Sequence, residues 1–201
     1  MKSATKIDIK SKLTELYEIT NETVEVISTL QTAFIYNTSK HLQEYRSKAE
    51  AVEKEIRPLS AIIKEAASGE EGMKPYVAVA EHLAKVWRNL GKLYELIDKK
   101  ISEKVLFSDK AVNETIYLLQ RLVEILRPTA DLILARNTFL SKYIQESRVN
   151  IENMADEYAT LHENRLITGE CLPLASSVYV GMLGAIKGIA WHTKEIAVVL
   201  G

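Results

Sequence analysis

Residues 162–200 read HENRLITGECLPLASSVYVGMLGAIKGIAWHTKEIAVVL and contain the end of one helix, a turn and a second helix. Gly169 is placed to end the first helix, because glycine readily adopts the left-handed conformation that follows a helix C-terminus. Pro173 suits the first turn of the next helix, where no backbone N–H is required. From Val178 onward apolar residues recur at helical spacing, which predicts that one face of this helix is buried.

Helical periodicity extends over the whole chain. Glycine and proline are scarce, with eight and four among 201 residues, and no long segment alternates polar and apolar side chains. We expect six long helices, at about residues 10–37, 39–67, 75–106, 109–135, 138–168 and 173–200. We also expect a loop at 68–72, kinks at Pro58 and Pro128, and an N-cap at Ser108 and Asp109. This pattern is typical of an all-α antiparallel helical bundle.

The third and sixth expected helices are similar at an offset of 99 residues, which pairs position 88 with position 187. Each helix follows a Gly-Glu pair and opens near a proline. The paired apolar residues are Val79 with Val178, Leu83 with Met182, Val86 with Ala185, Leu90 with Ile189 and Ile97 with Ile196. We therefore predict two three-helix repeats, residues 1–106 and 107–201, in one compact domain.

Composition and charge exclude several classes of function. The formal net charge is −1, so no overall positive field attracts nucleic acid or an anionic membrane. The single cysteine, Cys171, excludes an intramolecular disulfide and suits a reducing compartment. Residues 1–12 have no apolar core of a signal peptide, and no run of about eighteen apolar residues is present. We expect a cytoplasmic protein that neither inserts into a membrane nor binds nucleic acid.

The closing segment resembles the closing motif of the PhoU family and of the PhoU-like domain attached to sodium–phosphate cotransporters. The positions in register are His162, Arg165, Leu166, Gly169, Cys171, Pro173, Tyr179, Met182, Ile189, His192 and Ile196. The resemblance implies a fold of two three-helix repeats and a role in regulating inorganic phosphate transport. It also implies a homodimer whose partner is a membrane phosphate transporter or a sensor histidine kinase, which would hold it at the inner membrane.

PhoU-family proteins carry carboxylates four residues apart in the last helix of each repeat, where they bind multinuclear iron or zinc. That spacing places both side chains on one helix face. The matching positions here are Arg88 and Lys92 in the third helix, and Lys187 and Trp191 in the sixth. An ammonium or guanidinium group offers no metal ligand at neutral pH and repels a metal ion. We therefore predict that the metal sites of the family are absent and that no cofactor is bound.

Four acidic residues of the second and fifth helices lie in comparable stretches: Glu53, Glu55, Glu152 and Asp156. One interpretation is a solvated acidic face, where helix carboxylates usually lie. The other is that Lys92 and Lys187 pair with such acids, so that ion pairs replace the metal bridge.

No catalytic arrangement is recognisable in the sequence. The histidines, which are His41, His82, His162 and His192, match neither Glu-x-x-His nor H-E-x-x-H, so we expect them to be packed or on the surface. The resemblance makes Cys171 a structural thiol. The leading hypothesis is a non-catalytic regulatory or accessory protein of phosphate transport that acts by docking. The alternatives are a divergent helical scaffold or adaptor with a PhoU fold but no phosphate role, and a metal-dependent helical-bundle enzyme.

Overall fold

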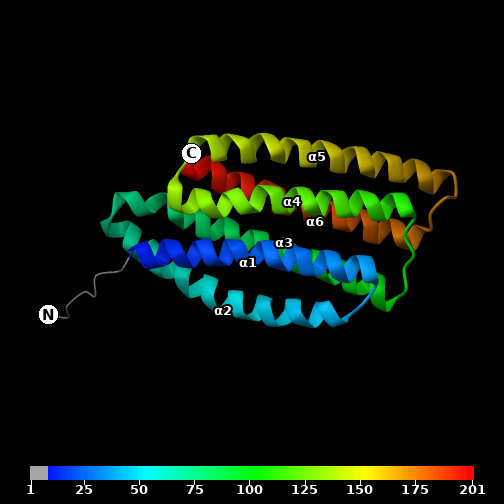
Figure 1. Ribbon diagram of the computed structural model, residues 1–201, viewed down its shortest axis with the longest axis horizontal. Coiled ribbons are helices and arrows are strands. Elements are labelled where there is room, and N and C mark those ends of the chain that lie inside the picture. Colours follow the sequence, from blue (N-terminus) through cyan, green and yellow to red (C-terminus); the bar gives the residue numbers. More distant parts are fainter. Residues whose placement is uncertain (1–8) are drawn as a thin grey trace.

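The computed structural model describes residues 9–201, which form six long helices and one short 3-10 helix (Figure 1). In chain order the elements are α1 (Ile9–Tyr36), α2 (Lys40–Gly69), η1 (Glu71–Met73), α3 (Lys74–Ser102), α4 (Asp109–Ala135), α5 (Thr138–Ile167) and α6 (Pro173–Leu200). No strand occurs among the residues that the structure describes. The expected all-α architecture is confirmed. The first two thirds of the segment inspected for a signal peptide, residues 1–8, lie outside the described part.

The helices form an elongated bundle of two trios. In the first trio α1 packs with α2 and α3, and in the second α4 packs with α5 and α6. The trios meet where α3 packs along α6, which is the most extensive contact between helices, and where α1 packs along α4. Figure 1 shows α2 and α5 on opposite outer sides of the bundle. This arrangement is two three-helix repeats, while the exact division at residues 106 and 107 stays an interpretation.

An approximate two-fold relation connects the trios where α3 crosses α6. A Cβ atom added at Gly188 would lie 2.6 Å from Oδ1 of Asn89, so the Asn89 side chain would have to move to admit a larger residue. Positions 89 and 188 are related by the offset of 99 residues. In a two-fold arrangement a residue meets its own counterpart only on the axis. The contact of Asn89 with Gly188 therefore places the axis here and supports the offset.

The core of the bundle is apolar along its length, and α6 is its most enclosed helix. By length and composition alone α6 is the one described helix that could cross a membrane. Half of its apolar window is buried inside the bundle, where α6 packs against α3, α4 and α5. This burial accounts for the apolar composition of α6.

Local capping interactions set several helix ends. Oγ of Ser108 accepts a hydrogen bond from the backbone N–H of Ala111 at 3.3 Å, which confirms the N-cap expected for α4. Gly169 has a φ of 76°, which is the left-handed conformation expected after α5. The next N–H, of Glu170, donates to the carbonyl of Arg165 at 2.8 Å and so completes the Schellman pattern.

Two boundaries predicted from the sequence are wrong. The loop expected at 68–72 is mostly helical, because α2 continues through Gly69 and η1 begins at Glu71. Met73, which is 2% exposed, anchors this segment in the core, and this packing overrides its loop-like composition. The third helix ends at Ser102 and not near residue 106, because Lys104 takes a left-handed φ of 52°. Neither Pro58 nor Pro128 interrupts its helix.

Candidate functional site

The four positions that match the family's metal motif lie on the outer parts of α3 and α6. Arg88 and Lys92 are exposed on α3, and Trp191 is 40% exposed on α6. Lys187 is half-buried, and its Nζ lies 2.5 Å from Oδ1 of Asp156 on α5. Lys92 makes no ion pair with any residue of the described chain. The structure therefore brings a motif position and an acid together in the second trio only.

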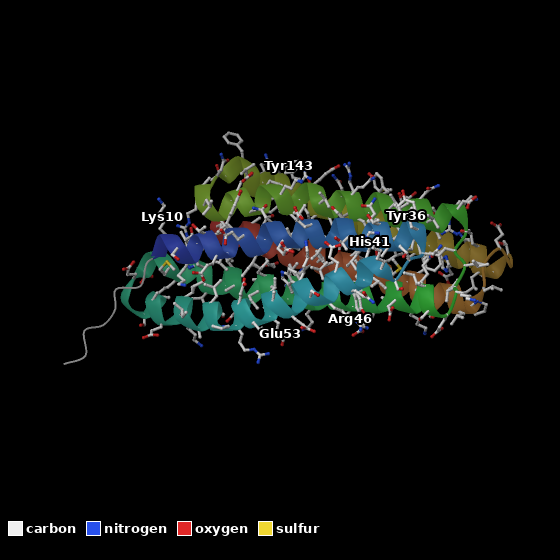
Figure 2. All side chains as sticks on the ribbon, turned by 60° about the horizontal axis from the view of Figure 1, so that its bottom comes forward. Lys10, Tyr36, His41, Arg46, Glu53 and Tyr143 are labelled. Carbon is white, nitrogen blue, oxygen red and sulfur yellow. The ribbon has the colours of Figure 1, made fainter. Side chains whose placement is uncertain are left out.

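The other three acids make no ion pair with a motif position. Glu152 pairs with Arg148 at 2.6 Å and Glu53 with Arg57 at 3.1 Å, each along its own helix. Glu53 and Glu55 are both exposed, and Glu53 lies on α2 at the surface of the bundle (Figure 2). Among residues 9–201, no group of three or more His, Cys, Asp or Glu side chains is placed to hold a metal ion. The donors present do not fit a multinuclear iron or zinc cluster.

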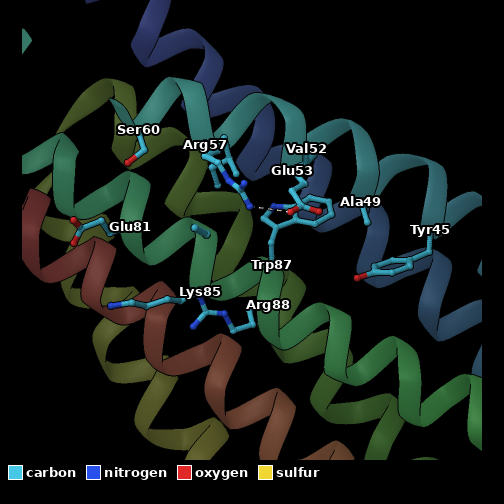
Figure 3. A pocket seen from close by; sticks show the side chains of 12 residues that line it. Tyr45, Ala49, Val52, Glu53, Arg57, Ser60, Glu81, Lys85, Trp87 and Arg88 are labelled. Carbon is cyan, nitrogen blue, oxygen red and sulfur yellow. Dashed lines mark hydrogen bonds and ion pairs between the residues drawn. The ribbon is translucent and has the colours of Figure 1, made fainter. Parts of the chain in front are cut away.

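A groove of about 630 Å³ lies between α2 and α3 (Figure 3). Its charged lining residues are the cations Arg57, Lys85 and Arg88 and the acids Glu53 and Glu81. Figure 3 shows Lys85 and Arg88 extending side by side from α3. Because Glu53 already pairs with Arg57, the other two cations face the groove with a single acid.

Trp87 on α3 also lines this groove, and its ring is directed toward α2 (Figure 3). The side chain is only 8% exposed. Its indole Nε1 has no hydrogen-bond partner among the described residues. An unsatisfied buried donor costs about 1–3 kcal/mol, so the groove contains a polar group that lacks an acceptor.

The charges of this groove differ from those at the equivalent place in the second trio. The offset of 99 residues relates Arg88 to Lys187 and Arg57 to Asp156. In the second trio the cation faces an acid at 2.5 Å. In the first trio both equivalent positions hold arginine, so the same ion pair cannot form. Arg88 makes no hydrogen bond or ion pair within the described chain, and its charge is available to an acidic partner.

Residues of the closing motif meet in a buried cluster between α4, α5 and α6. Arg165 Nη1 and Nη2 donate to the two carboxylate oxygens of Glu114 at 2.8 and 2.7 Å. The two side chains are only 7% and 11% exposed. The hydroxyl of Tyr179 donates to the same carboxylate. Burial, and then the hydrogen bond to Glu114, raise the pKa of the Tyr179 phenol. The cluster thus ties the turn between α5 and α6 to α4.

Two solved structures share this arrangement of helices. A PhoU-like protein from Shewanella oneidensis MR-1 superposes with a TM-score of 0.61 at 13% identity, over 94% of this chain and 96% of its own. A second protein of that organism, for which a PhoU-like phosphate regulatory role is proposed, gives a TM-score of 0.59 at 13% identity, over 94% of this chain and 96% of its own. The chain has a PhoU-like fold. No protein-family model and no curated protein sequence matches it, and the low identity to these structures establishes the fold alone.

His162 and Cys171 of the PhoU-like motif lie beside the buried cluster. The ring of His162 lies 4.5 Å from that of Tyr179, and its Nε2 lies 3.8 Å from Sγ of Cys171. Burial, and then the charge of Arg165, lower the pKa of His162. Its Nδ1 is buried without a partner among the described residues, so no third group orients the imidazole as a base for the thiol. The contact packs the turn between α5 and α6.

Two features of the site were missed in the sequence. Glu114 lies on the inward face of α4, one turn before the buried Leu118. An acid among the apolar residues of a buried helix face can be read from the sequence as a signal for a buried ion pair. The second feature is the contact of His82 with His192, which lie in different trios. No spacing in the sequence indicates that contact, because it depends on how α3 crosses α6.

Proposed function

We propose that this chain is a non-catalytic PhoU-like regulatory protein of inorganic phosphate transport and homeostasis. It acts by docking on a membrane phosphate transporter or on a sensor histidine kinase. The observation that carries the proposal is the groove between α2 and α3, where Lys85 and Arg88 have no acidic ion-pair partner. The PhoU-like fold and the closing motif support the link to phosphate.

The docking partner presents an acidic segment to this groove. Positive charge in a concave surface attracts acidic groups and accelerates their association. Arg57 pairs with Glu53 and leaves Arg88 without an acidic partner, whereas Asp156 neutralises Lys187 at the equivalent place. The first trio is therefore the docking half.

The protein works in the cytoplasm, at the inner membrane when it is bound to its partner, and as a homodimer. The family's metal clusters have no part in its action, because Arg88, Lys92, Lys187 and Trp191 replace their carboxylates. The resemblance to the PhoU-like domain of sodium–phosphate cotransporters makes that class of transporter the first partner to test.

Deletion of the chain in its host tests the proposal. We expect a changed rate of inorganic phosphate uptake and its restoration by the wild-type chain. We also expect the tagged chain to retain a phosphate transporter or a sensor kinase from solubilised membranes. Unchanged uptake, with a partner unrelated to phosphate, would favour the alternative of a helical scaffold. A metal-dependent turnover activity of the purified chain would favour the bundle enzyme.

A further inference from the structure

His82 on α3 and His192 on α6 face each other across the central helix contact. Their Nδ1 atoms lie 3.1 Å apart, and both side chains are half-buried. The ring of Trp191 lies 4.7 Å from that of His192 and 6.0 Å from that of His82. Two imidazole nitrogens from separate helices thus meet at one point, next to an indole.

The separation of the two nitrogens matches that of two ligands on one metal ion. Zinc–nitrogen bonds are about 2.0–2.1 Å long, so bond angles of about 90–110° separate the nitrogens by about 2.9–3.4 Å. Imidazole is a preferred ligand of zinc, copper, nickel and iron. To bind one ion, both rings must present an unprotonated Nδ1, which requires the Nε2–H tautomer of each imidazole.

The surroundings keep both imidazoles in the neutral form that a metal requires. Burial and the proximity of His82 lower the pKa of His192 to about 4. Burial and Lys85 lower the pKa of His82. Charges of both signs lie near the two histidines. The cations are Lys85, Arg88 and Lys194, and the acids are Glu81 and Glu195. These acids offset much of the repulsion that the cations exert on an incoming ion.

We propose that His82 and His192 bind one divalent transition-metal ion of the zinc type, which links α3 to α6. Water completes the coordination, because no third His, Cys, Asp or Glu of the described chain is placed as a ligand. With two protein ligands the site is exchangeable, and it is distinct from the family's carboxylate clusters. The inference rests on the imidazole pair and does not depend on the proposed role in phosphate transport.

Titration of the full chain with Zn²⁺ tests this site. Zn²⁺ should raise the melting temperature, because it binds the folded state and joins two helices. Mg²⁺ prefers oxygen ligands and should have no such effect. His82→Gln and His192→Gln should each weaken Zn²⁺ binding by well over about tenfold, since loss of even an outer-shell partner costs that much. The matched control is His41→Gln on α2, which should bind Zn²⁺ as the wild type does.

Tryptophan fluorescence gives a second readout that is local to the pair. Cu²⁺ bound between the rings should quench Trp191 in the wild type and in His41→Gln, but not in His82→Gln or His192→Gln. Trp87→Phe removes the other tryptophan, so the remaining fluorescence comes from Trp191 alone. Equal Zn²⁺ affinity in wild type and both histidine variants would overturn the proposal. So would the absence of Zn²⁺ binding by the wild type, because the pair would then be a hydrogen bond between two neutral rings only.

Discussion

The guanidinium of Arg165 on α5 holds the carboxylate of Glu114 on α4 through two parallel hydrogen bonds, at 2.8 and 2.7 Å. A paired geometry of this kind is among the stronger hydrogen-bonded contacts in proteins. Both side chains are nearly excluded from solvent, and Tyr179 on α6 donates to the same carboxylate. The closing motif is therefore a structural feature of this chain that joins three helices at one end of the bundle.

Glu114→Ala should lower the free energy of unfolding by about 3–5 kcal/mol, because the charge of Arg165 would be left buried without its partner. Tyr179→Phe should cost about 1.5–3 kcal/mol through loss of a hydrogen bond to a charged group. Urea denaturation measures both values. Glu53→Ala breaks an exposed pair with Arg57 and should cost about 0–1 kcal/mol. Equal costs for Glu114→Ala and Glu53→Ala would contradict a structural role of the cluster.

Substitution of two glycines by alanine should change stability in opposite directions. Gly169 has a φ of 76°, and a Cβ atom added there would meet nothing within 4 Å, so alanine should cost about 1–2 kcal/mol through backbone strain alone. Gly184 lies within α6, where an added Cβ meets nothing within 4 Å, so alanine should stabilise the helix by about 0.5–1 kcal/mol. Thermal and urea unfolding of both variants test the signs. A stabilising Gly169→Ala would show that the turn after α5 does not need this conformation.

Acid should weaken the contact between α3 and α6. Burial and the neighbouring His82 lower the pKa of His192 from 6.5 to about 4 in the folded chain. Between about pH 6.5 and 4 the unfolded state then binds more protons than the folded state, so the free energy of unfolding should fall as pH falls through this window. Above about pH 7 the pair should contribute no pH dependence.

The difference between wild type and the His82→Gln/His192→Gln double variant isolates this effect, because other titrating groups are common to both. The measurement is urea denaturation at several pH values from 7.5 to 4.5, with chelator present. The wild type should lose more stability than the double variant. Parallel curves would contradict neutral imidazoles at this contact.

Much of the fold could be predicted from the sequence because helices are local structures. The 3.6-residue period indicates every long helix, and Gly169 and Ser108 mark ends by their own backbone chemistry. Composition predicts a loop at 68–72, but the buried Met73 holds this segment in helical turns through tertiary packing. Local composition does not contain that contact.

The candidate site was less predictable, for the same physical reason. Four-residue spacing correctly groups Lys187 with Trp191 on one helix, but it cannot indicate which cation finds an acid. Asp156 meets Lys187 because α5 packs on α6, whereas the equivalent helix α2 has Arg57 there. The contact between His82 and His192 likewise follows from the crossing of α3 and α6.

Lys187→Glu together with Trp191→Asp would restore the family's ligand pair in the second trio, close to Asp156. In a His82→Gln/His192→Gln background, we expect this variant to gain iron or zinc affinity that its parent lacks. Elemental analysis after gel filtration without chelators measures the bound metal. Lys187→Gln with Trp191→Asn is the matched uncharged control. More than one equivalent of iron or zinc per wild-type chain would show that other residues of the chain hold a metal cluster.

The central claim is that the cationic groove of the first trio docks the chain onto a component of phosphate transport. The most direct test is the rate of labelled phosphate uptake by host cells in which the wild-type chain is deleted and the Arg88→Glu variant is expressed. Arg127→Glu reverses another exposed arginine, on α4, and is the matched control. We predict that Arg127→Glu restores wild-type uptake and Arg88→Glu does not, although both variants melt as the wild type does. Full restoration of wild-type uptake by Arg88→Glu would contradict the account.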